Sequence, residues 1–233
     1  MQESALVLAF TLISTGNPDL FEIIGLSLRV SIVSVFFSLL LGLSLGASLA
    51  VSRFRGRQVL TILINSMMSL PPVVVGLLVY LALSRSGPLG WLGLLYTPTA
   101  MIIAQTLLIT PLVAALSRQV IEDLFVEYKE QFQSLRLTQS QQINALLWDS
   151  RYSLLTVALA GLGRSLSEVG AVIIVGGNID HLTRVMTTAI ALETSKGDLP
   201  LALALGLILL TMALMINALL ATINFSAKRQ AYA

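Results

Sequence analysis

Long apolar runs constrain this sequence more than any other feature. Several stretches of about 20 residues are nearly free of charge, and a helix of that length crosses the roughly 30 Å of bilayer hydrocarbon. Of the 233 residues, 56% are hydrophobic and only 11% are charged, against about 25% charged residues in an ordinary soluble domain. Mean hydropathy is +0.87. The sequence therefore excludes a soluble globule and predicts an all-α, polytopic membrane protein whose helices satisfy their own backbone hydrogen bonds.

Helix start and stop signals divide the apolar runs into five spans. Two of the spans follow the dipeptides Asn17–Pro18 and Thr97–Pro98. These dipeptides indicate helix starts, because Asn and Thr cap free amides and proline loses no bond at a first helical position. The expected spans are about 21–51, 58–84, 98–118, 152–175 and 200–224. Residues 4–16 are too short to cross and predict an interfacial helix. The whole chain, 1–233, is expected to form a single transmembrane domain.

Basic residues are distributed unequally between the two sets of loops. Only three lie on one side, namely Arg85, Arg184 and Lys196. Nine lie on the other: Arg53, Arg55, Arg57, Arg118, Lys129, Arg136, Arg151, Lys228 and Arg229. Loops rich in Lys and Arg stay in the cytoplasm. The N-terminus is therefore expected outside and the C-terminus in the cytoplasm.

One long cytoplasmic segment, 119–151, combines eight charges with apolar residues at helical spacing. This pattern predicts two short amphipathic helices beneath the bundle, which either dock a soluble partner or simply pack on the membrane face. The sequence has no G-x-x-x-x-G-K-[ST] phosphate loop. If ATP drives the protein, another subunit must hydrolyse it. With no cysteine and one histidine, we expect no metal site and no covalent chemistry.

Charges within the spans need a partner or water, since each costs about 2.5–3.5 kcal/mol at membrane depth on insertion scales. Arg164 and Glu168 are spaced four residues apart, and Gly161 and Ser165 share their expected helix face. The pair is either a structural clasp between helices or a gate in a transport path. Arg29, near the outer end of the first span, either attracts an anion or extends toward the interface.

Prolines predict interrupted helices. Pro71 and Pro72 fall within the second span and Pro111 within the third, where each removes an amide donor and clashes with the preceding turn. Broken helices at this depth are tolerated where they line a wet cavity or are buried in protein; a kinked bundle helix is the other interpretation. Gly42 and Gly46 form a G-x-x-x-G pair, which permits close helix contact.

Three stretches resemble a known family. GRSLSEVGAVIIVGGNI at Gly163–Ile179 resembles the fourth-span signature of permease subunits of molybdate, tungstate and sulfate ABC importers. SLPPVVVGLLVYLALSRSGPLG at Ser69–Gly90 and YTPTAMIIAQT at Tyr96–Thr106 resemble the tungstate branch. The resemblance covers about residues 17–225.

The resemblance implies a type I ABC importer permease that forms a homodimer in the plasma membrane. It also implies two cytoplasmic ATPase subunits, which bind ATP and Mg, and an external binding protein that delivers the oxyanion. No cofactor is expected on this chain, and no nucleic acid.

The resemblance further places the helix that couples to the ATPase within 119–151. The family pattern there reads E-A-A, three residues, Gly and a later Pro, and aligns with Glu130, Gln131, Phe132, Arg136 and Tyr152; Thr138 completes the expected coupling residues. Only the glutamate matches. Replacement of the glycine by Arg136 and of the proline by Tyr152 puts the geometry of the turn in question.

The expected function is inward movement of tungstate or a related tetrahedral oxyanion by alternating access. The same fold carrying molybdate or sulfate is the first alternative. An ion-coupled secondary transporter is the second, but such proteins often contain inverted repeats, and none is visible here. A membrane scaffold without transport leaves the charged stripe and the broken helices unexplained.

Overall fold

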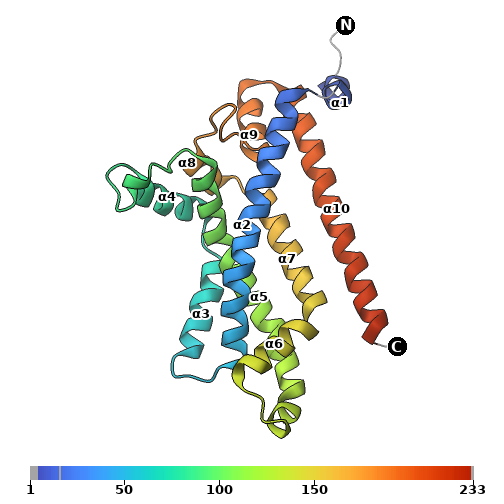
Figure 1. Ribbon diagram of the computed structural model, residues 1–233. Coiled ribbons are helices and arrows are strands. Elements are labelled where there is room, and N and C mark those ends of the chain that lie inside the picture. The colour runs from blue at the N-terminus through green and yellow to red at the C-terminus, as the bar shows by residue number, and fades with distance from the viewer. Residues whose placement is uncertain (1–4, 16, 232–233) are drawn as a thin grey trace. The chain divides into compact units, whose positions relative to one another are not determined.

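The computed structural model describes residues 5–15 and 17–231 (Figure 1). Within these ranges every regular element is helical. In chain order the elements are α1 (Ala5–Thr15), α2 (Pro18–Val51), α3 (Arg57–Met68), α4 (Pro72–Leu83), the short 3₁₀ helix η1 (Gly90–Leu92), α5 (Pro98–Ser134), α6 (Gln139–Asp149), α7 (Arg151–Leu166), α8 (Gly170–Gly176), α9 (Met186–Lys196) and α10 (Leu199–Ala231). The predicted all-α class is confirmed.

The apolar helices allow between three and five membrane spans, against the five predicted. Helices α2, α5 and α10 are each long and apolar enough to cross a membrane, and the total becomes five if the bent pairs α3–α4 and α7–α8 each count as one span. The cap signals also act as predicted. The Asp19 amide donates to Asn17 Oδ1 at 2.9 Å, and the Ala100 amide donates to Thr97 Oγ1 at 3.4 Å.

Helix α5 departs from prediction at two points. It runs through Pro111 without interruption, so the expected helix break there is wrong. Proline removes a single backbone bond, and the fully buried Ile109 and Val113 hold the helix on both sides. The helix also continues to Ser134, so only α6 is a separate amphipathic helix in segment 119–151. The first of the two helices expected there is the end of α5.

Helix α9 has no counterpart among the expected elements, because residues 186–196 lack a long apolar run. Thr187, Thr188 and Glu193 are nevertheless buried. The N-terminal helix α1 forms within the stretch expected to be interfacial, whose outer limits, residues 4 and 16, lie outside the described residues.

The chain forms two compact units, and α2, α5, α7 and α10 contribute residues to both. The first unit comprises the chain up to residue 34, 71–105 and 163–216; the second comprises 35–70, 106–162 and the chain from 217 onward.

In the first unit, the second halves of the two bent pairs, α4 and α8, lie side by side (Figure 1). A Cβ atom at Gly76 would lie 2.7 Å from the Cα of Ala171, and one at Gly170 would lie 2.8 Å from Cγ2 of Val73. Contacts this short are possible only without a side chain. Small residues therefore let the two backbones touch, as in membrane helix pairs generally.

In the second unit, α2 packs against α5 through the G-x-x-x-G pair. A Cβ at Gly42 would lie 2.7 Å from Val113 Cβ, and one at Gly46 would lie 2.6 Å from the Ala114 carbonyl oxygen. Helix α6 folds back beside the end of α5 (Figure 1). A buried cluster joins these helices: Ala47, Ala50, Val51, Ile121, Phe132 and Leu146.

Candidate functional site

A buried polar junction lies in the first unit, where α2, α5 and α7 meet. Gln105 Oε1 accepts hydrogen bonds from Ser34 Oγ at 2.9 Å and from Ser165 Oγ at 2.8 Å. Gln105 Nε2 donates to the Ser165 carbonyl at 3.2 Å. All three side chains are at least 96% buried. The junction replaces lost water contacts with internal bonds and so fixes three helices to one another.

Ser165 was expected to line the transport path, and the structure places it in this junction. Its partners Ser34 and Gln105 were not predicted. The sequence does contain a pattern that points to Ser34: Ser27, Ser31, Ser34 and Ser38 recur at helical spacing along α2. All four are buried. A polar stripe on an otherwise apolar helix marks a face turned toward protein.

The cavity beside the junction is small. Its volume is about 10 Å³, and Ser27, Ser31, Gln105, Glu168 and Thr187 are among its lining residues. A single water needs a space of about this size, so a tetrahedral oxyanion does not fit. In this conformation the junction is closed to cargo.

Glu168 lies in the break between α7 and α8. Its Oε1 accepts from the Ala171 amide at 3.2 Å, and its carbonyl accepts from Thr187 Oγ1 at 2.8 Å. The side chain is buried. A carboxylate at the start of a helix satisfies an amide that has no intrahelical partner. Glu168 therefore caps α8 and ties the break to α9.

The predicted shared helix face of Arg164 and Glu168 is wrong, because α7 ends at Leu166. Ser167 Oγ donates to the carbonyls of both Gly163 and Arg164, a competing bond that bends helices. Arg164 is exposed. Among the described residues, no ion pair joins it to Glu168. The clasp interpretation therefore fails, and Arg164 stands as an exposed cation on an apolar helix.

The other expected path residues, Gly161 and Arg29, do not take part in the hydrogen bonds of this junction. A Cβ at Gly161 would lie 3.3 Å from Ile109 Cγ2, so this glycine serves the packing of α7 on α5. Arg29 is exposed on α2, and no ion pair to it occurs within the described part of the chain. Its role in a path stays a prediction.

The predicted second span is broken beside Pro71 and Pro72, where α3 ends and α4 begins. Pro71 is extended, with φ −61° and ψ 125°, and its carbonyl accepts from the Val74 amide at 3.0 Å. Pro72 is the first residue of α4, a position where proline costs no bond. The two prolines thus end one helix and begin the next.

The expected coupling residues surround the turn from α5 to α6. The Leu137 amide donates to the Phe132 carbonyl and the Arg136 amide to the Gln133 carbonyl, both at 3.1 Å. With Arg136 at φ +51°, this is a Schellman helix end. Thr138 then caps α6 in a capping box with Gln141. Arg136 thus adopts the left-handed backbone that glycine favours, at the position where the family pattern has glycine.

The expected coupling residues differ in their exposure to solvent. Glu130 and Gln131 are exposed at the end of α5, whereas Phe132 is 95% buried in the cluster that holds α6. Tyr152 is exposed on α7, and its ring lies 4.8 Å from the Arg151 guanidinium carbon. Among the expected coupling residues, Glu130 and Gln131 are thus available to a partner, and Phe132 and Thr138 shape the turn.

Asp19, Glu22 and His181 could offer ligands to a metal ion, with ligand atoms within 4.8 Å of one another. His181 Nδ1 lies 2.9 Å from a Glu22 carboxylate oxygen. This hydrogen bond raises the pKa of the His181 imidazole, and the Asp180 charge adds to the effect. A protonated imidazole cannot ligate a metal. Proton binding to His181 therefore competes with metal binding at this cluster, and protonation adds a charge to its contact with Glu22.

Comparisons with known proteins agree with this architecture. A crystal structure of a bacterial ABC transporter involved in the import of the acidic polysaccharide alginate matches 94% of this chain and 82% of its own chain. Its TM-score is 0.72 at 20% sequence identity, which shows a shared fold.

Curated relatives cover most of the chain. The tungstate uptake system permease protein TupB of Peptoclostridium acidaminophilum is 41% identical over 91% of this chain and 93% of its own length. A probable anion ABC transporter permease protein of Haloferax volcanii is 40% identical over 86% and 88%. The TupB protein of Campylobacter jejuni is 37% identical over 70% and 69%.

A sequence family matches residues 38–229, which include the polar junction's Gln105 and Ser165 and the whole α5–α6 turn. Its description is "Binding-protein-dependent transport system inner membrane component". The all-helical architecture, the paired broken helices and this match agree, and the chain belongs to the family of inner membrane components of binding-protein-dependent transport systems, which are ABC transporter permeases.

Proposed function

We propose that this chain is the permease subunit of an ATP-driven importer that moves tungstate, or a related tetrahedral oxyanion, into the cytoplasm by alternating access. The identity of 41% to a tungstate uptake permease over nearly the full length of both chains carries this proposal. The probable anion permease of Haloferax volcanii, at 40% identity, supports the oxyanion class.

The proposed assembly contains two copies of this chain, two cytoplasmic ATPases and an external binding protein. The N-terminus lies outside and the C-terminus in the cytoplasm. The excess of basic residues in one set of loops supports this orientation. ATP and Mg bind to the ATPases, and this chain holds no cofactor.

Alternating access gives the junction and Arg164 separate roles. The cavity beside Ser34, Gln105 and Ser165 is closed, so the path opens only after a change of conformation. Arg164 faces that path from the exposed side of α7, where it attracts the anionic cargo. Glu168 caps α8 and does not contact the cargo, because a carboxylate repels an anion.

Uptake by proteoliposomes tests the cargo. Vesicles holding this chain and its ATPase, supplied with the binding protein, should accumulate labelled tungstate, and excess unlabelled tungstate should suppress uptake more than equal molybdate or sulfate. Removal of ATP should abolish uptake, and collapse of ion gradients should leave it unchanged. Stronger suppression by molybdate or sulfate would transfer the proposal to that oxyanion. Uptake that survives without ATP and fails with the gradient would indicate a secondary transporter.

The exposed end of α5 predicts a docking site for the ATPase. Reversal of charge in Glu130→Lys should lower co-purification of the ATPase and cut ATP-driven uptake about tenfold, because an interfacial charge contact is replaced by repulsion. The fold should persist, since the Glu130 side chain is exposed. Glu127→Lys, also exposed on α5, is the matched control. Equal ATPase binding by both variants would exclude Glu130 from the interface.

A further inference from the structure

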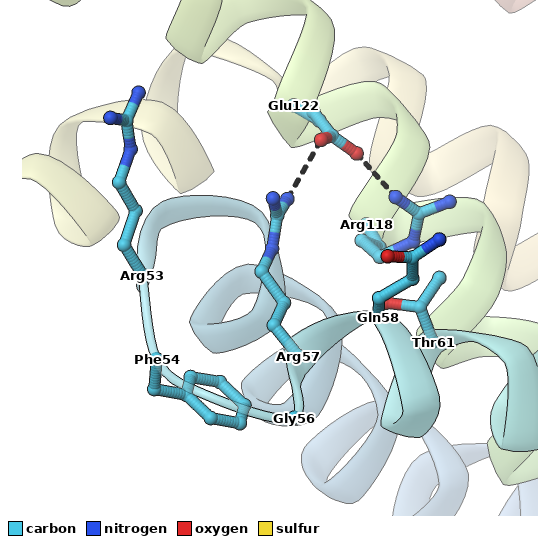
Figure 2. A pocket seen from close by; sticks show the side chains of 8 residues that line it. All are labelled: Arg53, Phe54, Gly56, Arg57, Gln58, Thr61, Arg118 and Glu122. Atoms are coloured by element: carbon cyan, nitrogen blue, oxygen red, sulfur yellow. Dashed lines mark hydrogen bonds and ion pairs between the residues drawn. The ribbon is translucent and has the colours of Figure 1, made fainter.

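A second feature lies in the second unit, where the loop between α2 and α3, the start of α3 and the middle of α5 line one cavity. A cavity of about 620 Å³ opens there (Figure 2). Its lining includes Arg53, Arg57, Arg118 and Glu122, together with Phe54 and Gln58. Neither the proposed cargo path nor the coupling turn uses it.

Two of the three arginines are held in place by Glu122. Arg57 Nη2 donates to Glu122 Oε1 at 2.7 Å, and Arg118 Nη1 pairs with Oε2 of the same carboxylate, as Figure 2 shows. Arg57 Nε also donates to the Leu49 carbonyl at 2.6 Å, which satisfies the end of α2. These guanidinium groups are therefore fixed before any ligand arrives, which lowers the entropic cost of binding.

The cavity carries more positive than negative charge. Its lining contains three arginines and one carboxylate, so two positive charges are in excess. Arg53 forms no ion pair with any described residue. The Nε of Arg118 is buried, and no acceptor for it occurs among the residues that the structure describes. The site therefore has a free cation and an unused donor.

This chemistry suits a tetrahedral oxyanion. The planar guanidinium group offers paired N–H donors that match two oxygens of a phosphate. The neighbouring helix α3 exposes Val59, Ile62 and Leu63, side chains that suit contact with lipid chains. In the proposed orientation, the cavity lies at the cytoplasmic membrane surface, where anionic lipid headgroups gather.

We propose that this cavity binds a phosphate-type oxyanion group, supplied by an anionic lipid headgroup or by a free ion, with Arg53 as its mobile contact and Arg57 and Arg118 as its fixed ones. Its place at the membrane surface rests on the orientation given under the proposed function. The bound group neutralises the excess charge and stabilises the loop between α2 and α3.

Thermal unfolding of the purified full-length chain tests the proposal. The chain in uncharged detergent is titrated with phosphatidylglycerol, with phosphatidylcholine, and with inorganic phosphate at constant ionic strength. Arg53→Gln removes the unpaired cation. Arg55→Gln is the matched control, because Arg55 is exposed in the same loop and does not line the cavity. Each titration gives an apparent affinity from the rise in Tm.

Phosphatidylglycerol should raise the Tm of the wild type and of Arg55→Gln, with affinity about tenfold weaker in Arg53→Gln, the effect of losing one charge-assisted hydrogen bond. Phosphatidylcholine should have little effect. The same pattern with inorganic phosphate alone would support the site and identify a free ion as its ligand. Equal affinities in all three proteins, or no shift with any anion, would overturn the proposal. Because the measurement is binding and not uptake, a wrong cargo assignment leaves its result intact.

Discussion

Replacement of Gly46 by valine should strongly destabilise the protein and leave little of it folded. A Cβ at this position would lie 2.6 Å from the Ala114 carbonyl oxygen and would also clash with Ser117 Oγ. The serine side chain can rotate away, but the carbonyl belongs to the backbone of α5 and cannot. Helices α2 and α5 must separate, and overpacking of this kind costs about 1–3 kcal/mol or more. We expect a clear fall in Tm and in the monodisperse fraction after detergent extraction.

Gly25→Val supplies the control within the same helix. Beyond its chain neighbours and the backbone of its own helix, no atom lies within 4 Å of a Cβ built at Gly25, so this variant should unfold at nearly the wild-type temperature. Gly46→Ala should fall between the two, because a methyl group meets the same carbonyl with less bulk. If Gly46→Val and Gly25→Val unfold at the same temperature, the close approach of α2 and α5 is wrong.

Arg164→Met should leave the fold intact and reduce uptake at least about tenfold, the effect of losing roughly 1.4 kcal/mol of interaction with the cargo. The side chain is exposed, and substitutions at such positions usually change stability by no more than about 0.5 kcal/mol. Arg164→Lys should retain part of the uptake because it keeps the charge. Arg85→Met, an exposed arginine between α4 and η1, should retain all of it.

Substitution of Glu168 should change stability, whereas substitution of Arg164 should change uptake and leave stability intact. Glu168→Leu leaves the Ala171 amide buried without its acceptor, at a cost of about 1–3 kcal/mol. Glu168→Gln keeps an acceptor oxygen and should retain most of that stability. Thermal unfolding separates these two variants without reference to transport.

The double variant Arg164→Met with Glu168→Gln tests whether the two residues are paired. Sites that share no partner give additive changes within about 0.3–0.5 kcal/mol, and we expect additivity in the free energy of unfolding. A clasp would instead make the double variant more stable than the sum of the single changes. Wild-type uptake in Arg164→Met would remove Arg164 from the transport path.

The sequence by itself determined the membrane class and the approximate helix limits. A run of apolar residues has no favourable place in water, and capping residues act over three or four positions, so both signals are local. Asn17 and Thr97 thus start α2 and α5 where predicted. The interruption at Pro71–Pro72 is equally local, because two lost donors in succession leave no helix to continue.

Tertiary packing decided the cases in which local rules gave competing answers. A single proline, Pro111, sits within α5 because buried neighbours on both sides hold the helix. The α7–α8 break, residues 167–169, contains neither proline nor glycine. There Ser167 bonds back to α7 carbonyls, and Glu168 accepts from the Ala171 amide and is tied to Thr187 of α9. Arg164 and Glu168 are four residues apart, a spacing that predicts a contact only if one helix contains both. Helix α7 ends between them, at Leu166.

For the candidate sites, too, the sequence predicted some features and only the structure shows the others. The family pattern placed Arg136 at a glycine position, and only the structure shows that Arg136 adopts a left-handed backbone there. The serine stripe of α2 was legible in the sequence, whereas its partner Gln105 was not, because hydrogen bonds between residues 71 and 60 positions apart leave no periodic trace. The arginine cavity likewise brings Arg53 and Arg57 to Arg118 and Glu122. Local patterns fixed which residues form helices, and only three-dimensional contact fixed which of their polar groups meet.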